Sequence, residues 1–273
     1  MTSKFCVVGS PIEHSLSPVI HNAAYSHLDL DFVYERHEVP SGTLQSFIDE
    51  TSFAGLSVTM PLKYEAFSFA DQSSEAAATT GVANTLVQDS SGWVAHNTDV
   101  FGIAQCIKSK SFASQVVVLG SGATARSAIL AINDLFPSAK LGIVARNMDA
   151  ANKINEFARS LTDNVSLESA SVDMLFAADI VVSTVPVTGY DNLWAELAAS
   201  TEKPDGLLLD VAYNPWPSMA ARAWGLNTVS GLEMLIWQAV QQVRLFADSR
   251  GESSDFDSNE LYEVMKRAVA ESN

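Results

Sequence analysis

Short apolar runs alternate with longer amphipathic stretches along most of the chain. Residues 5–9, 56–59 and 115–120 have the length and composition of buried strands, and stretches with helical spacing follow them. Strands that are joined through helices pair in parallel, because each crossover returns the chain to the same end of the sheet. The pattern therefore predicts an α/β protein with mostly parallel sheets.

The predicted elements form two groups that meet near residue 100. Strands are expected at residues 5–9, 32–39, 56–59, 82–87, 93–96, 115–120, 141–145, 179–184 and 207–211, and helices at 17–28, 43–49, 63–70, 99–110, 124–135, 150–161 and 231–247. Ser17 is the expected N-cap of the first helix, with Pro18 in its first turn. Residues 249–259 are predicted to form an exposed loop before a terminal helix. We expect two α/β domains, residues 1–100 and 101–230, followed by helices in residues 231–273.

The charge balance excludes several classes of partner. The chain has 32 acidic and 16 basic residues, a net charge of −16. Nucleic acids and anionic membranes select cationic faces, so neither is an expected partner. The apolar runs are shorter than the roughly 18 residues that span a bilayer, and the one after Lys4 is too short for a signal peptide. Cys6 and Cys106 show no disulfide or metal spacing, which favours the cytoplasm.

A glycine-containing turn follows the predicted strand at residues 115–120. The segment from Gly120 to Ala125 reads Gly-Ser-Gly-Ala-Thr-Ala, a variant of the dinucleotide fingerprint, and it opens a predicted helix. The first glycine allows the tight turn, Gly122 lets the backbone approach a pyrophosphate, and the helix N-terminus attracts the phosphate charge. The alternative is an ordinary tight turn between a strand and a helix.

The next strand ends at Ala145-Arg146-Asn147, without the acidic residue that usually binds the ribose of NAD. An arginine there suits a 2′-phosphate, so the cofactor is expected to be NADP, with NAD less favoured. Alternatively, Asp149 pairs with Arg146 or caps the following helix.

Cations are scarce in the first hundred residues, where Lys4, Arg36 and Lys63 face twelve acidic residues. Lys63 follows a buried strand, at the end of a parallel sheet where ligands collect. It could donate a proton or stabilise an alkoxide there, or it could be a solvated lysine in a helix's first turn.

Other polar residues have both a structural and a functional interpretation. Asp99 could cap a helix, and Ser15 and Ser17 could be turn residues or, beside free helix N–H groups, cradle a carboxylate. Gln238 shares a helix face with Met234 and with Gln241 or Gln242, a face that local sequence alone would leave in solvent. The histidines, His14, His21 and His96, show no convincing ligand spacing and read as structural, so no metal is expected.

Six segments together resemble the shikimate dehydrogenase family, in the family's order, between residue 5 and about residue 247. They are GSPIEHSLSPVIHN from Gly9, SVTMPLK from Ser57, ANTL from Ala83, NTDVFG from Asn97, DVAYNP from Asp210 and GLEMLIWQA from Gly231.

The resemblance implies NADP-linked, reversible reduction of 3-dehydroshikimate to shikimate in the cytoplasmic biosynthesis of chorismate and aromatic amino acids, by a monomer or homodimer. It implies a substrate-binding first domain, a Rossmann-type second domain, and a C-terminal helix that returns to the first. Lys63 and Asp99 would be the catalytic pair. The substrate would be bound by Ser15, Ser17, Thr59, Lys63, Asn84, Asp99, Tyr213 and Gln238. The cofactor would be bound by Gly120, Ser121, Gly122, Ala123, Thr124, Ala145, Arg146, Asn147, Val211 and Gly231.

The chain departs from the family's pattern at a few positions. Ser57 replaces the usual asparagine, Ala123 a glycine, and Ala145 an asparagine that would donate to the 2′-phosphate, and Val82-Ala83 inverts the usual order. Two alternatives stay open: an NAD-dependent quinate/shikimate dehydrogenase with the same fold, and a dinucleotide-binding sensor without catalysis. The presence of both Lys63 and Asp99 argues against the sensor.

Overall fold

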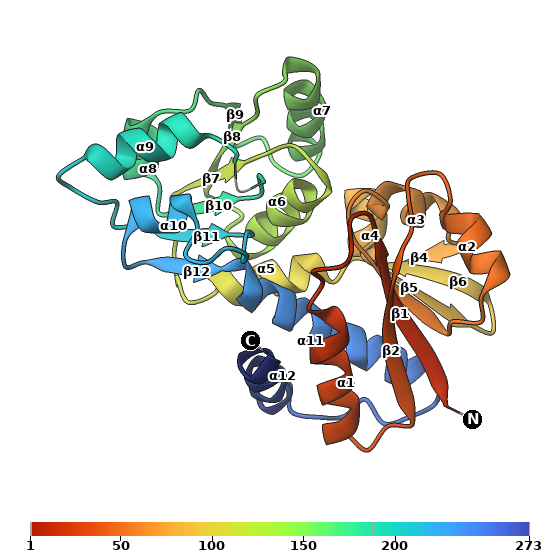
Figure 1. Ribbon diagram of the computed structural model, residues 1–273. Coiled ribbons are helices and arrows are strands. Elements are labelled where there is room, and N and C mark those ends of the chain that lie inside the picture. Colours follow the sequence, from red (N-terminus) through yellow and green to blue (C-terminus); the bar gives the residue numbers. More distant parts are fainter. Residues whose placement is uncertain (1, 187, 273) are drawn as a thin grey trace. The chain divides into compact units, whose positions relative to one another are not determined.

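A computed structural model describes residues 2–186 and 188–272 and divides the chain into two compact units (Figure 1). The first unit comprises Met1–Phe101 and Ile236–Asn273, and the second comprises Gly102–Leu235. The chain passes from one unit to the other inside two helices, α5 (Asp99–Ile107) and α11 (Gly231–Ser249). The C-terminal segment therefore belongs to the same unit as the N-terminal hundred residues.

The first unit is built on a six-stranded sheet with the strand order β2-β1-β3-β5-β6-β4. Its strands are β1 (Ser3–Gly9), β2 (Phe32–Glu38), β3 (Gly55–Val58), β4 (Gln72–Ser73), β5 (Thr85–Asp89) and β6 (Gly92–His96). β1 pairs in parallel with β2 and β3, whereas β5 runs antiparallel to β3 and β6. Residues just after β3 and just before β5 therefore meet at one edge of the sheet.

Helices cover both faces of this sheet, which explains why β1 is apolar at nearly every position. On one face, Phe5 of β1 stacks on Phe246 of α11 with the ring centroids 4.5 Å apart, and α1 (Ser17–His27) packs against α12 (Ser258–Ser272). On the other face, Cys6 and Val8 belong to a buried cluster with residues of α2 (Leu44–Glu50), α3 (Lys63–Phe69) and α4 (Glu75–Thr80).

The second unit contains a six-stranded sheet with the order β12-β11-β10-β7-β8-β9, and all its pairs are parallel. The strands are β7 (Gln115–Leu119), β8 (Lys140–Val144), β9 (Val165–Leu167), β10 (Ile180–Ser183), β11 (Leu207–Asp210) and β12 (Thr228–Ser230), and the helices are α6 (Ala123–Leu135), α7 (Met148–Arg159), α8 (Val172–Ala177), α9 (Asp191–Ala199) and α10 (Met219–Trp224). The strand order reverses between β7 and β10, the switch point at which Rossmann-type sheets bind dinucleotides. The predicted α/β class, with a mostly parallel first sheet and a Rossmann-type second one, is confirmed.

The longer predicted elements are present, with ends shifted by a few residues. Ser17 was predicted to be the N-cap of α1, but Leu16 occupies that position. The Ser17 side chain lies buried beside the Tyr34 hydroxyl. The strand expected from residue 82 begins at Thr85, because the Ala83 N–H donates to the Lys63 carbonyl instead of to a strand. The pattern missed seven short elements: β4, α4, β9, α8, α9, α10 and β12.

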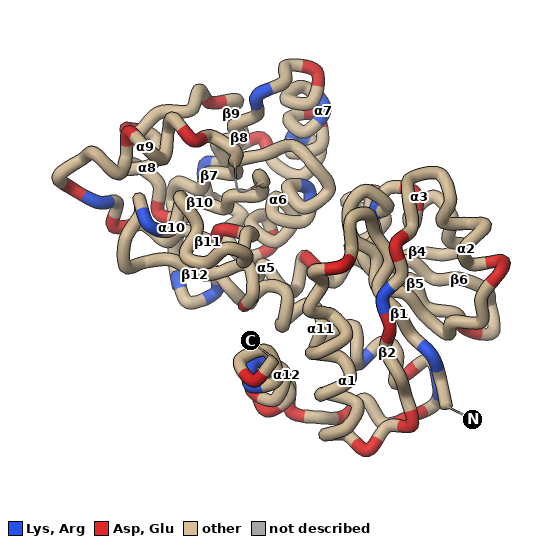
Figure 2. Tube along the Cα trace, in the orientation of Figure 1, with Lys and Arg blue, Asp and Glu red and all other residues tan. Residues whose placement is uncertain are grey.

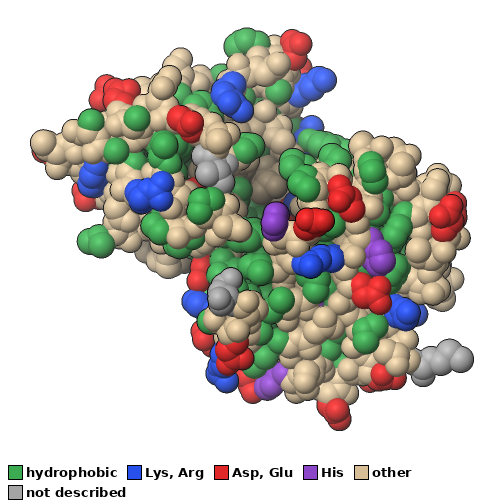
Figure 3. Space-filling view, viewed as in Figure 1, with side chains coloured by type: hydrophobic (Ala, Val, Ile, Leu, Met, Phe, Trp, Pro, Cys, Tyr) green, Lys and Arg blue, Asp and Glu red, His purple; other side chains and the backbone are tan. Residues whose placement is uncertain are grey.

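Charged residues are distributed over both units. Asp and Glu positions are spread along the whole trace in Figure 2, and Lys and Arg side chains are dispersed among them on the face shown in Figure 3. Across the described part of the chain, we find no helix long and apolar enough to cross a membrane.

Candidate functional site

Lys63 and Asp99 are brought together in the first unit, 36 residues apart in sequence. Each is the first residue of a helix, Lys63 of α3 and Asp99 of α5. The Lys63 ammonium donates to Oδ2 of Asp99, and the two side chains are only 13% and 6% exposed. Both alternatives raised for these residues, a solvated lysine and a helix-capping aspartate, therefore disagree with the structure.

Asn84, which directly precedes β5, connects to this pair. Its Oδ1 accepts a hydrogen bond of 2.8 Å from the backbone N–H of Thr98. A backbone N–H can only donate, so this contact fixes the orientation of the amide and turns Nδ2 toward Asp99. Nδ2 donates to Oδ1 of Asp99 over 2.9 Å. Both carboxylate oxygens of Asp99 are thus held, one by Asn84 and the other by Lys63.

Gln238 reaches the same cluster from α11. Its Oε1 accepts from Nδ2 of Asn84 at 3.0 Å and from the Thr98 hydroxyl at 3.2 Å, and the residue is 6% exposed. The solvated position that local sequence suggested for Gln238 is therefore wrong. A buried polar cluster of Lys63, Asn84, Thr98, Asp99 and Gln238 closes one edge of the sheet, and below we call it the lysine cluster.

The serines lie near the carboxyl end of β1, beside the loop that follows β3. The Ser15 hydroxyl accepts from the Ser17 backbone N–H at 3.3 Å, at the start of α1. A Cβ at Gly9 would lie 2.4 Å from Cγ2 of Thr59 and 2.8 Å from the Met60 carbonyl. Glycine at position 9 therefore lets the ends of β1 and β3 approach each other, which places Thr59 close to the segment that carries both serines.

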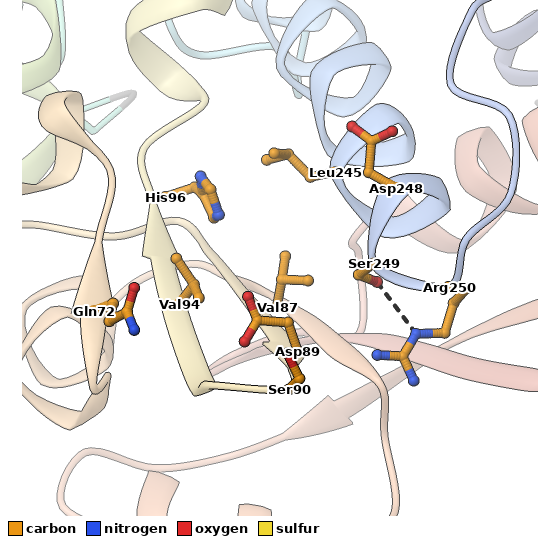
Figure 4. Close-up of a pocket in the computed structure, with 10 residues that line it drawn as sticks. All are labelled: Gln72, Val87, Asp89, Ser90, Val94, His96, Leu245, Asp248, Ser249 and Arg250. Carbon is orange, nitrogen blue, oxygen red and sulfur yellow. Dashed lines mark hydrogen bonds between the residues drawn. The ribbon is translucent and has the colours of Figure 1, made fainter.

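A separate groove of about 660 Å³ lies on the first unit, between the β5–β6 hairpin, Gln72 of β4 and the end of α11 (Figure 4). Arg250 borders it but is committed to the Gln88 carbonyl and the Ser249 hydroxyl. His96 lines it as well, and burial lowers the pKa of its imidazole. The residues that line this groove include no predicted site residue.

In the second unit, the turn after β7 has the geometry that a phosphate-binding turn requires. Gly120 has φ +125°, and a Cβ there would lie 2.2 Å from Oγ1 of Thr184, so the position requires glycine. A Cβ at Gly122 would meet no atom within 4 Å. Gly122 is the N-cap of α6, whose first N–H groups have no intrahelical partners. Open space beside these donors would accommodate a pyrophosphate, and the binding role of residues 120–124 stays a prediction.

The end of β8 carries Ala145, Arg146 and Asn147. Arg146 is exposed, and its guanidinium lies 5.8 Å from the centroid of the Tyr190 ring. The Asn147 side chain caps α7 by accepting from the Ala150 N–H at 3.1 Å, so the cap is not Asp149. The guanidinium is therefore exposed at the end of β8, and its expected contact with a 2′-phosphate stays a prediction.

Val211 and Gly231 are adjacent in the second unit. A Cβ at Gly231 would lie 1.9 Å from the Val211 carbonyl oxygen, so only glycine lets α11 begin this close to the end of β11. Tyr213 follows in the same loop, and burial raises the pKa of its phenol. Tyr213 belongs to the second unit, so its expected contact with the substrate stays a prediction.

Gln242 and Tyr34 also join this polar network, through hydrogen bonds to Ser57, although neither was a predicted site residue. The only available signal was the four-residue spacing between Gln238 and Gln242. Within residues 2–186 and 188–272, His, Cys, Asp and Glu form no group of three or more that could hold a metal ion.

Comparisons with known proteins identify chains that resemble this one. The model of the shikimate dehydrogenase substrate binding domain matches residues 7–86. The shikimate dehydrogenase (NADP(+)) of Desulfitobacterium hafniense (strain Y51) is 30% identical over 250 residues, which cover 88% of this chain and 90% of that protein.

Solved structures extend the similarity to nearly the whole chain. The shikimate dehydrogenase of Mycobacterium tuberculosis is 35% identical, with a TM-score of 0.84 over 98% of this chain and 99% of that one. The Thermus thermophilus enzyme, solved with NADP(H) and shikimate, is 26% identical, with a TM-score of 0.79 over 97% and 99% of the two chains. On these similarities and the site just described, the chain belongs to the shikimate dehydrogenase family.

Proposed function

We propose that the protein catalyses the reversible, NADP-linked reduction of 3-dehydroshikimate to shikimate. The observation that carries this proposal is the lysine cluster, in which an almost buried ammonium is held by a carboxylate that a carboxamide fixes in turn. A ring ketone that accepts a hydride needs such a group, because negative charge develops on its oxygen.

The substrate is bound by hydroxyl and amide groups of the first unit. Ser15 and Ser17 hold the carboxylate through their hydroxyl groups. Thr59, Asn84 and Gln238 bind the ring hydroxyls. The relative from Thermus thermophilus, solved with shikimate and NADP(H), supports this substrate class.

Lys63 is the residue that transfers the proton. Its ammonium donates a proton to the ketone oxygen during reduction, and its neutral amine accepts one from the hydroxyl during oxidation, while Asp99 keeps Nζ in place. No step is assigned to a metal, because Lys63 itself provides positive charge and a proton at the reacting oxygen.

The turn after β7 and the end of β8 fit a dinucleotide that carries a 2′-phosphate. The N–H groups at the start of α6 bind the pyrophosphate, and Arg146 binds the 2′-phosphate, supported by Asn147. Val211 and Gly231 accommodate the nicotinamide. The bound cofactor supplies the hydride, and the protein supplies position, charge and the proton.

We place the reaction in the cytoplasm. Both cysteines, Cys6 and Cys106, are free and buried, and burial raises the pKa of each thiol. Free thiols of this kind are usual in a reducing compartment.

Absorbance at 340 nm with shikimate or quinate, each with NADP or NAD, tests the proposed function. We expect the fastest turnover with shikimate and NADP. Preference for quinate and NAD would instead identify the related quinate dehydrogenase activity. Dinucleotide binding without turnover of either substrate would identify a sensor.

A further inference from the structure

A line of buried hydrogen bonds runs beneath the proposed substrate site, entirely within the first unit. It begins at Tyr34, whose hydroxyl lies beside Ser17 and donates to Oγ of Ser57. The Ser57 hydroxyl donates to Oε1 of Gln242 over 2.7 Å. Gln242 belongs to α11, 185 residues further along the chain. These bonds connect the serine end of the site to the helix that also carries Gln238.

The line continues from Gln242 into the lysine cluster. Nε2 of Gln242 donates to Oγ1 of Thr85 at 2.8 Å and to the Asn84 backbone carbonyl at 3.2 Å. The Thr85 hydroxyl in turn donates to Oδ1 of Asn84 at 2.9 Å. Gln242 therefore holds Asn84 at its backbone carbonyl directly and at its amide oxygen through Thr85. Nδ2 of the same Asn84 amide faces Asp99.

Every member of this line is buried. Gln242 is 1% exposed, Ser57 is 5% exposed and Asn84 is 3% exposed. A buried amide keeps its place only if its donors and acceptor are satisfied, and Gln242 has partners for both ends. A network of this kind holds each group in one orientation, so the Asn84 amide is oriented before substrate binds.

Position 57 is where the line passes from β3 to α11. The Ser57 side chain ends in a hydroxyl, and the amide of Gln242 stands against it. The amide at this part of the site therefore comes from α11.

We propose that Gln242 is a positioning residue for the lysine cluster. It fixes Asn84, and through Asn84 the Asp99 carboxylate that holds Lys63. The inference rests on the proposed function, because its effect is measured on the turnover of shikimate.

The first experiment replaces Gln242 with methionine, which keeps the length of the side chain and removes the amide. We expect Gln242→Met to lower kcat with shikimate about tenfold, to raise the KM for shikimate and to leave the KM for NADP unchanged. The matched control is Gln241→Met, the same change one position earlier on α11, and it should keep wild-type constants. A role limited to stability would lower the unfolding temperature without this split between the constants.

Thr85→Val provides a second variant that does not depend on how well Gln242→Met folds. It removes only the hydroxyl between Gln242 and Asn84 and keeps the shape of the side chain. We expect the same direction of change in kcat and in the KM for shikimate.

A rescue experiment tests whether the two positions share one function. Ser57→Asn alone puts a longer side chain against Gln242, and Gln242→Ala alone removes the amide, so each should lower kcat/KM for shikimate about tenfold or more. The double variant carries the amide on β3, and it should recover to within about threefold of wild type.

The inference is overturned if folded Gln242→Met or Thr85→Val keeps kcat and the KM for shikimate within twofold of wild type. It is also overturned if the double variant is no better than the poorer single variant. An inactive wild-type protein would instead overturn the proposed function, and the inference would fall with it.

Discussion

Lys63 and Arg146 are cations of a strongly acidic chain, and each follows a strand, β3 and β8. Their surroundings, however, differ. Lys63 is 13% exposed and paired with Asp99, whereas Arg146 is exposed with its guanidinium over the Tyr190 ring. A paired, nearly buried ammonium suits proton transfer to a bound ketone. An exposed guanidinium suits a phosphate that arrives from solvent.

Removing the Lys63 ammonium should affect turnover more than binding. We expect Lys63→Ala to lower kcat by roughly two to four orders of magnitude, the usual contribution of a proton-transfer group, with a much smaller change in the KM for shikimate. Steady-state kinetics measures both constants, and Lys4→Ala on β1 is the control. A variant that keeps more than about a third of wild-type turnover would show that Lys63 has no catalytic role.

Arg146→Ala should discriminate between the two cofactors. Only NADP carries the 2′-phosphate, so we expect the KM for NADP to rise about tenfold or more and that for NAD to stay nearly constant. Arg159→Ala, at the end of α7, is the control. Equal effects on both cofactors would mean that Arg146 supports the loop and does not bind the phosphate.

At the scale of elements, local packing fixes two segments near the proposed sites. One is the turn between β7 and α6, and the other is helix α1. The turn needs glycine at position 120 for its backbone and at position 122 for open space. Helix α1 buries His21, which stacks on Tyr34 with the ring centroids 4.0 Å apart and contacts the Ser17 carbonyl through Nδ1.

Two glycine substitutions should separate folding from cofactor binding. Gly120→Ala forces a Cβ toward Thr184 at a positive φ, so we expect it to lower the free energy of unfolding by about 1–3 kcal/mol. Gly122→Ala meets no neighbour and should keep that free energy, yet its methyl group would stand where the pyrophosphate approaches and weaken NADP binding. Urea unfolding and fluorescence titration with NADPH measure the two effects, and the reverse pattern would contradict the assigned roles.

Acid should destabilise the protein through His21. Burial lowers the pKa of His21 from its ordinary value of 6.5 to about 4 in the folded state. The unfolded chain therefore takes up the proton first, and stability that is complete above pH 6.5 is lost as the pH falls toward 4, by about 3 kcal/mol. Urea unfolding at several pH values should show a smaller loss in His21→Asn, whereas exposed His14→Asn should match wild type. An unchanged loss in His21→Asn would assign the acid sensitivity to other groups.

At the scale of the whole molecule, a net charge of −16 repels anionic substrates and cofactors, so binding depends on local donors. Lys63, Arg146, the hydroxyls of Ser15 and Ser17, and the first turn of α6 are the proposed donors. The first unit is also assembled from both ends of the chain, since Ile236–Asn273 completes it. Helix α12 contributes Leu261, Tyr262, Met265 and Val269 to its core.

This assembly predicts which segments of the chain a core mutation destabilises. Met265 is fully buried, and Met265→Ala should lower the free energy of unfolding by about 2–5 kcal/mol. Hydrogen exchange should accelerate in both segments of the first unit, including β1 and α1, and stay unchanged in β7 and β10. Met148→Ala, at a position 67% exposed, is the control. Faster exchange spread evenly over both units would show that they do not unfold separately.

The sequence by itself determined the α/β class, the longer elements and the positions of the glycine turn, because apolar periodicity and glycine geometry are local properties. Lys63 and Asp99 could be selected as candidates for the same reason, whereas only the family resemblance pointed to Asn84 and assigned the roles of all three. Short elements such as β4 and α10 were not predicted, because two to six residues are too few to show a hydrophobic period.

Only the tertiary structure decided which polar residues meet. Asn84 and Gln238 are 154 residues apart and Ser57 and Gln242 are 185 apart, yet each pair shares a hydrogen bond. Local spacing left Gln238 in solvent and could not choose between Gln241 and Gln242, because the face that a helix buries depends on what packs against it. Burial of α11 against the first sheet made that choice, since a buried amide must find partners and those partners came from strands far away in sequence.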